Sequence, residues 1–212
     1  MGIGPRVRRR LGRFERPAAE LYRRVFVDLD SFVASIRSEV HTPPRILEIG
    51  CGEGRVIERL AHTFREACIT GIDICAQPGR LCTITEPRIR FLKITAAQMA
   101  AAEPASYPLI IIGDVLHHVP RTEREGLLKH AAMLLAPGGV LIFKEWVRQK
   151  TPAYLMGYCA DRFITGDKVH YMREEELKNL ATGVFGATSI RSQFRVPPWN
   201  CNLALVIVPH AR

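Results

Sequence analysis

The chain of 212 residues lacks several features that define other classes of protein. No apolar run approaches the roughly 20 residues needed to cross a bilayer. No apolar block with a small-residue cleavage site follows the basic start, so we expect no secretory signal and a cytoplasmic location. The six cysteines include no C-x-x-C pair and the histidines complete no zinc pattern, which indicates free thiols and no bound metal.

Acidic residues are scarce at one end of the chain. The net charge is +9, and residues 1–24 hold eight arginines against two glutamates. Such a cluster attracts nucleic acid, anionic lipid or an acidic carrier protein. Because no aromatic residues are interleaved with it, specific nucleic-acid recognition is not expected. We expect residues 1–16 to be a basic, flexible segment that is either simply solvated or in contact with a membrane surface or an anionic carrier protein.

The third glycine of a dinucleotide-binding fingerprint is also missing. Residues 46–49 read as a buried strand, Gly50, Gly52 and Gly54 follow it, and apolar residues then recur at helical spacing. A dinucleotide fingerprint requires glycine at the sixth position, where this chain has Arg55, a side chain too bulky for that packing. The G-x-G-x-G pattern still predicts a tight turn whose N–H groups approach a ligand.

Polar residues follow each of the next expected strands. The strand at 68–73 ends in Asp73, and a carboxylate in this position can accept two hydrogen bonds from a ribose diol or cap a following helix. The strand at 89–94 precedes Thr95. A continuous apolar run at 109–113 predicts a strand buried on both faces and leads directly into Asp114. A turn at 136–139 precedes a fifth strand at 140–143.

Three segments resemble motifs of the class I S-adenosylmethionine (SAM) methyltransferases: EIGCGEG at 48–54, DVLHHV at 114–119 and LLAPGGVL at 134–141. They occur in the order typical of that family, and the L-H-H segment is similar to that of small-molecule methyltransferases of the quinone-biosynthesis type. The resemblance implies an α/β fold, a Rossmann-like doubly wound sheet of seven mostly parallel strands with an antiparallel last strand and helices on both faces. One position departs from the family pattern, since many relatives carry Asp where this chain has Thr95. Adenine recognition is therefore expected from backbone groups, Thr95 or Gln98.

The same resemblance implies a cofactor and a reaction. SAM would donate a methyl group to an O, N or C nucleophile of a small-molecule acceptor, lipid-like or anionic, by in-line displacement, leaving S-adenosylhomocysteine. The cofactor-binding residues that it implies are Glu48, Gly50, Cys51, Gly52, Gly54, Asp73, Ile74, Thr95, Ala96 and Asp114.

A hydroxyl acceptor needs a base, and a histidine can titrate near neutral pH. The first candidates are His117 and His118, for which packing around the cofactor is the alternative role. His170 and Tyr154 are second candidates, because they lie in a polar and aromatic segment at 148–172 that we expect to cover the substrate. Residues 17–212 are predicted to form one domain that begins with a long amphipathic helix at 17–40.

Two other classes of protein stay open. One is a non-catalytic SAM-fold protein that binds or scaffolds a partner. The other is an NAD(P)-dependent oxidoreductase, which is disfavoured by Arg55 and by the lack of a Y-x-x-x-K pair.

Overall fold

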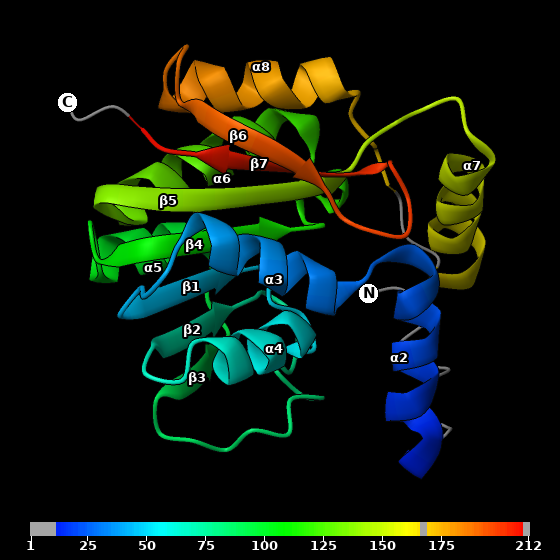
Figure 1. Cartoon of the computed structure of the whole chain (residues 1–212), viewed down its shortest axis with the longest axis horizontal. Helices are drawn as coiled ribbons and strands as arrows, with labels where there is room; N and C mark the ends of the chain where they lie inside the picture. The colour runs from blue at the N-terminus through cyan, green and yellow to red at the C-terminus, as the bar shows by residue number, and fades with distance from the viewer. Residues whose placement is uncertain (1–11, 166–168, 210–212) are drawn as a thin grey trace.

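The computed structural model describes residues 12–165 and 169–209. They form a single sheet in the order β3-β2-β1-β4-β5-β7-β6 with helices on both faces (Figure 1). The strands β1 to β5 are parallel, and β7 runs antiparallel to both β5 and β6. The predicted fold class is confirmed. The strand bounds are β1 (Arg45–Ile49), β2 (Cys68–Ile72), β3 (Ile89–Leu92), β4 (Tyr107–Gly113), β5 (Leu135–Trp146), β6 (Ile190–Arg195) and β7 (Asn202–Ile207).

The helices divide between the two faces of the sheet. The cluster on one face includes α3 (Leu29–Glu39) and α4 (Arg55–Thr63), and the cluster on the other includes α5 (Ala96–Ala102), α6 (Arg121–Leu134) and α8 (Glu174–Phe185). The remaining helical elements are η1 (Gly12–Phe14), α2 (Glu15–Phe26), η2 (Leu116–His118), α7 (Pro152–Cys159) and a π-helical turn (Ala160–Thr165).

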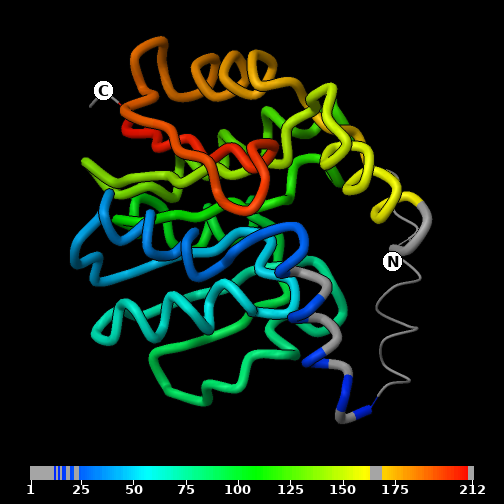
Figure 2. Tube along the Cα trace, turned by 45° about the vertical axis from the view of Figure 1, so that its right-hand side comes forward, coloured from blue at the N-terminus to red at the C-terminus, as the bar shows by residue number. Residues whose placement is uncertain are grey.

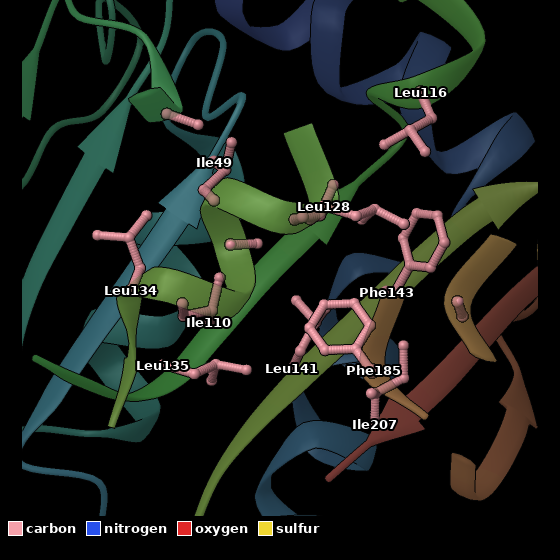
Figure 3. Close-up of a cluster of buried hydrophobic side chains, with 14 of the residues drawn as sticks. Ile49, Ile110, Leu116, Leu128, Leu134, Leu135, Leu141, Phe143, Phe185 and Ile207 are labelled. Atoms are coloured by element: carbon pink, nitrogen blue, oxygen red, sulfur yellow. The ribbon is translucent and has the colours of Figure 1, made fainter. Parts of the chain in front are cut away.

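Strand β4 shows why the apolar run is continuous. Leu109 and Ile111 pack into the cluster with α3 and α4, whereas Ile110 and Ile112 pack into the cluster with α5, α6 and α8. Figure 3 shows Ile110 in the second cluster, beside side chains from β5 and α6. A strand covered on both faces needs an apolar residue at every position, so the period-2 alternation disappears.

The predicted single helix at 17–40 is wrong in its continuity. Helix α2 ends at Phe26, and α3 begins at Leu29 after Asp28. The Asp28 carboxylate accepts from the N–H groups of Asp30 and Ser31, both at 3.0 Å, and so caps the N-terminus of α3. Residues 12–16, expected to be flexible, belong to η1 and the start of α2; residues 1–11 lie outside the described part.

The predicted turn at 136–139 is a bulge within β5. Leu135 pairs with Tyr107 and Val140 pairs with Leu109, so five residues of β5 span a distance that β4 covers in two. Gly138 has φ +70°, which lets the extra residues fold out of the sheet.

Helices α2 and α7 lie beyond the ends of the strands, on the same side of the sheet in both views (Figure 1, Figure 2). This is the side at which β1, β4 and β5 end, and it holds the candidate site. Within the described ranges, no helix has the length and apolar character to cross a membrane.

Candidate active site

The glycine turn after β1 folds back onto the end of β2. The N–H groups of Gly50 and Cys51 donate to the Ile72 carbonyl at 2.8 and 3.1 Å. Gly50 has φ +77°, and a Cβ there would lie 2.4 Å from Cγ2 of Val115, so no other residue fits this position without displacing its neighbours. The predicted tight turn is therefore present. It brings the ends of β1, β2 and β4 together.

A cavity of about 830 Å³ opens beside this turn. Seven of the predicted cofactor residues line it, namely Gly50, Gly52, Asp73, Ile74, Thr95, Ala96 and Asp114. Gly54 lines neither this cavity nor the one described below, because it is the N-cap of α4 and faces Phe91 and Gly79. The wall is mostly apolar, and Ile74 is 74% exposed along it, a surface suited to the flat face of an adenine.

Asp73 lies in the wall of the larger cavity, directly after β2. Its Oδ2 accepts from the Gly52 N–H at 2.7 Å and its Oδ1 from the Cys75 N–H at 2.8 Å. A carboxylate offers about four acceptor sites, so both oxygens retain capacity for hydroxyl donors. No helix lies between β2 and β3, both of which are described in full, so the helix-cap alternative does not apply.

Thr95 and Gln98 form the capping box of α5. The Thr95 Oγ1 accepts from the Gln98 N–H at 3.2 Å, and the Gln98 Oε1 accepts from the Thr95 N–H at 2.9 Å. Gln98 is thus used within the helix cap and does not line the cavity, whereas Thr95, Ala96 and Ala97 do.

A second cavity, of about 330 Å³, lies under α2 and α7. It shares Gly50, Gly52, Asp114 and His118 with the larger cavity. Glu48 and Cys51 line only this smaller cavity. Burial raises the pKa of the Cys51 thiol well above its usual range, so Cys51 is an inert, neutral wall residue. The shared residues mark the point at which a group could pass from one ligand to the other.

Asp114 sits at this junction with an unusual backbone. Its φ is +57°, a conformation uncommon for residues other than glycine. Its Oδ2 forms an ion pair with Lys144, whose side chain is 2% exposed. The Asp114 N–H also donates to the Lys144 carbonyl at 2.9 Å, so the end of β5 holds this turn in place.

His117 and Glu145 form a buried pair. The Glu145 Oε1 accepts from the N–H groups of Val115 and Leu116, at 2.9 and 2.6 Å, and its Oε2 lies 2.7 Å from the His117 Nδ1. Because a carboxylate only accepts, Nδ1 carries the proton and the Nε2 of a neutral ring is left as the acceptor. Burial opposes the charged ring, but the Glu145 carboxylate outweighs it and raises the pKa of His117 above its ordinary value. Sequence reasoning missed Glu145; its position at the carboxyl end of β5 was the available signal.

The other histidine and tyrosine candidates lie at different depths. His118 is exposed and borders both cavities, with its ring centroid 4.1 Å from that of His117. His170 is exposed and lines neither cavity; its backbone N–H donates to the His117 carbonyl at 2.9 Å. Tyr154 stands one layer behind the cavity wall, edge-on to Tyr171 at 5.7 Å. The structure thus brings His117 and His118 to the junction and leaves the side chains of His170 and Tyr154 outside it.

Asp114, His117 and Glu145 also have ligand atoms within 4.8 Å of one another, a spacing that could hold a metal ion. The Lys144 ammonium already pairs with Asp114, and both Glu145 oxygens have partners. We therefore assign no ion to this cluster, and the absence of a metal stays a prediction.

Arg55, the residue that breaks the dinucleotide fingerprint, fastens α2 beside the glycine turn. Its guanidinium, 5% exposed, forms ion pairs with Glu20 of α2 and with Glu58 of its own helix. Arg59 adds a second bond to Glu20 at 3.0 Å. Helix α2 thereby reaches the smaller cavity, which its last residue, Phe26, helps to line.

The profile of a family described as a methyltransferase domain matches residues 18–184. The chain belongs to this family, and its fold and glycine turn place it among the class I S-adenosylmethionine-dependent methyltransferases.

Curated relatives include ubiquinone biosynthesis O-methyltransferases. The chain is 28% identical over 144 residues to that of Saccharophagus degradans, covering 63% of this chain and 59% of the relative. It is 34% identical over 116 residues to that of Aeromonas salmonicida, covering 53% and 47%. The chain thus spans less than two thirds of the length of these relatives.

A solved structure with the same fold is the 1,6-didemethyltoxoflavin-N1-methyltransferase of Burkholderia thailandensis with bound 1,6-didemethyltoxoflavin and S-adenosylhomocysteine. Its TM-score is 0.69 at 15% identity, with 96% of this chain and 87% of that chain covered.

Proposed function

We propose that the protein transfers a methyl group from SAM to the hydroxyl oxygen of a small-molecule acceptor in the cytoplasm. The observation that carries the choice of oxygen is the buried His117–Glu145 pair beside the junction of the two cavities. A hydroxyl must lose its proton as its oxygen attacks, and a histidine oriented by a carboxylate is the group that takes it. The curated relatives described above are also O-methyltransferases.

The larger cavity would hold the cofactor. The glycine turn would contact its methionine end, Asp73 its ribose hydroxyls and residues 95–97 its adenine. When bound, SAM supplies an electrophilic methyl group on a positively charged sulfur.

The smaller cavity would hold the acceptor, with its hydroxyl facing the shared wall. His117 Nε2 takes the hydroxyl proton, and Glu145 stabilises the imidazolium that results. Helices α2 and α7 cover the acceptor and exclude water, which would otherwise weaken the electrostatic interactions of the site.

Calorimetric titration with S-adenosylhomocysteine tests the cofactor assignment. We expect micromolar binding by the wild-type chain and no binding of NADH. Asp73→Ala should weaken S-adenosylhomocysteine about 10- to 100-fold, because it removes hydrogen bonds to a charged group. The exposed Asp30 lies outside both cavities, so Asp30→Ala is the matched control and should bind like the wild type. Absence of S-adenosylhomocysteine binding by the wild type would overturn the proposal.

We also propose that the basic start of the chain contacts an anionic surface, either a membrane or an acidic carrier protein. The start of the described chain supports this with exposed apolar side chains at Phe14 of η1 and at Leu21 and Val25 of α2. Arg16 already pairs with Glu58. We therefore expect the contact with the anionic surface to come from the arginines of residues 1–11, which lie outside the described part.

Vesicle sedimentation tests this surface. The full chain should bind phosphatidylglycerol vesicles at low salt and bind neutral phosphatidylcholine vesicles much less. A variant that lacks residues 1–11 should lose most of the binding, at about 1 kcal/mol per arginine removed. Equal binding to both kinds of vesicle, or none to either, contradicts binding to an anionic membrane. An acidic carrier protein would then be the surface to test.

A further inference from the structure

The segment that covers the acceptor cavity is fastened to the turn that carries His117. The His170 N–H donates to the His117 carbonyl at 2.9 Å. Arg124 of α6 bridges the covering segment and this turn. Its Nη2 donates to the His170 carbonyl at 2.7 Å, and its Nε donates to the Val119 carbonyl at 3.0 Å. The backbone around His170 is therefore held against η2, and the position of the next residue, Tyr171, is set by these bonds.

Tyr171 lies directly on the His117 ring. The two rings stack with centroids 5.0 Å apart and planes 26° apart. The Tyr171 hydroxyl donates to the carboxylate of Asp161, in the π-helical turn that follows α7. Both Tyr171 and Asp161 line the smaller cavity. Tyr171 is thus held next to η2 through the backbone bonds of its neighbour His170, and its own hydroxyl is held by the covering segment.

This stack supplies a constraint that Glu145 does not. The bond from Nδ1 to Glu145 fixes one atom of the imidazole, but the ring can still tilt about that bond and swing Nε2 away from the acceptor. A flat ring against its face removes that freedom. An aromatic face also favours the positive charge that His117 acquires when it takes a proton.

We propose that Tyr171 is a positioning residue for His117, and that its bond to Asp161 links closure of the covering segment to alignment of the base. The inference rests on the proposed function in assigning His117 the proton. When α7 and the π-helical turn lie over the acceptor, Asp161 holds the Tyr171 hydroxyl and the His117 ring is clamped. When the segment opens, the bond is lost and the ring is free to tilt.

Several charged and titratable groups face His117 from the surrounding elements. Glu145 comes from β5, Asp114 from the turn after β4, and Asp161 from the π-helical turn. Tyr171 and His118 contact the ring itself. Burial, followed by the charge of Asp161, raises the pKa of Tyr171, so its hydroxyl stays a donor and does not compete for the proton.

Variants at Tyr171 separate stacking from bonding. Tyr171→Leu removes the ring and should lower kcat about 10- to 100-fold with little change in the affinity for S-adenosylhomocysteine, because the base is misplaced while the cofactor cavity is intact. Tyr171→Phe keeps the stack but loses the bond to Asp161, so its kcat should lie between those of Tyr171→Leu and the wild type. The acceptor for these assays is whichever of catechol, 4-hydroxybenzoate and a long-chain alkylphenol the wild type methylates fastest. Tyr158→Leu, in the same segment but outside both cavities, is the matched control and should leave kcat unchanged.

A double-mutant cycle tests the link to Asp161. Tyr171→Phe and Asp161→Ala break the same hydrogen bond, so the double variant should have the kcat of the more affected single variant. Losses that add independently, or unchanged kcat in Tyr171→Leu, would overturn the proposal. Parallel losses of kcat, cofactor affinity and melting temperature in Tyr171→Leu, unrescued by phenylalanine, would also overturn it, because they indicate a merely structural role.

A proton NMR readout keeps this test independent of turnover. The Nδ1–H of His117, bonded to Glu145, should give a low-field resonance in the wild type and in Tyr171→Phe. It should broaden or vanish in Tyr171→Leu. If S-adenosylhomocysteine binds but no acceptor is methylated, the role of His117 as a base is contradicted. The resonance still reports on the positioning of the ring, so the two failures can be distinguished.

Discussion

Glu145→Gln is expected to lower kcat roughly 100- to 1,000-fold while S-adenosylhomocysteine binds nearly as before. The glutamine oxygen can still accept from the Val115 and Leu116 N–H groups, so η2 keeps its place. The amide nitrogen, however, now donates to the His117 Nδ1. The neutral ring must then carry its proton on Nε2, the atom that has to accept the proton of the acceptor hydroxyl. The variant therefore keeps the positions of η2 and His117, but the neutral imidazole carries its proton on the wrong nitrogen.

The pH dependence of the same variant has a definite sign. The Glu145 carboxylate raises the pKa of His117 against the opposing effect of burial. In the wild type, kcat/KM should therefore increase with pH as His117 loses its proton. Removing the carboxylate charge lowers the pKa of His117, so this limb of the profile should move to lower pH in Glu145→Gln even as the plateau falls.

The exposed Glu125, which pairs with Lys129 on α6, provides the control. Glu125→Gln should leave both the plateau and the pH limb where they are. If Glu145→Gln retains its plateau while His117→Ala loses it, the carboxylate is not the orienting group. If both variants retain it, His117 is not the base.

Gly50→Ala is expected to destabilise the protein by about 2–5 kcal/mol, combining the cost of a left-handed backbone with overpacking against a neighbour. The backbone there has φ +77° and the new methyl group would meet Cγ2 of Val115 at 2.4 Å. Gly50 and Val115 both line the cofactor cavity. Relief of the clash must therefore move one of its walls, and S-adenosylhomocysteine affinity should fall roughly 100-fold, equivalent to ~2.7 kcal/mol.

Gly138 makes this measurement specific. It has φ +70°, close to that of Gly50, but nothing lies within 4 Å of the position its Cβ would take. Gly138→Ala should therefore show the backbone cost alone, about 1–2 kcal/mol in chemical unfolding, with unchanged cofactor affinity. If Gly50→Ala matches Gly138→Ala in both stability and affinity, the close approach of the glycine turn to Val115 has no role in binding.

Local sequence patterns predicted most of the fold and most of the residues that line the cofactor cavity. Apolar runs such as 109–113 mark buried strands because both faces of the sheet are covered. The glycine turn and Asp73 are recognisable because a tight turn and a carboxylate at a strand end have few other uses in this spacing. Each of these signals lies within a few residues of the chain.

The contacts around the smaller, acceptor cavity could not be predicted from local patterns. Glu145 reaches His117 across 28 residues, and Tyr171 reaches Asp161, in the π-helical turn, across 10. The local pattern places Glu145 at the carboxyl end of a strand, but it does not show which residue the carboxylate contacts. The break between α2 and α3 did have a local signal, the capping Asp28 followed by Ser31, which the continuous apolar periodicity concealed.

Arg55 shows how one residue can mislead and inform. In the sequence it only excluded a dinucleotide fingerprint. In the structure it is buried between Glu20 and Glu58 and anchors α2 beside the glycine turn. Its partner Glu20 could not be assigned from the sequence, because Glu20 lies in a helix whose docking site is set by tertiary packing.

The wall common to both cavities has a thermodynamic consequence. Gly50, Gly52, Asp114 and His118 would contact both ligands, so ordering of these groups by one ligand is felt by the other. Such coupling is reciprocal: whatever factor the cofactor product applies to the dissociation constant of an acceptor, the acceptor applies the same factor to that of the product. An acceptor too weak to titrate directly therefore becomes measurable through the displacement of the S-adenosylhomocysteine binding curve.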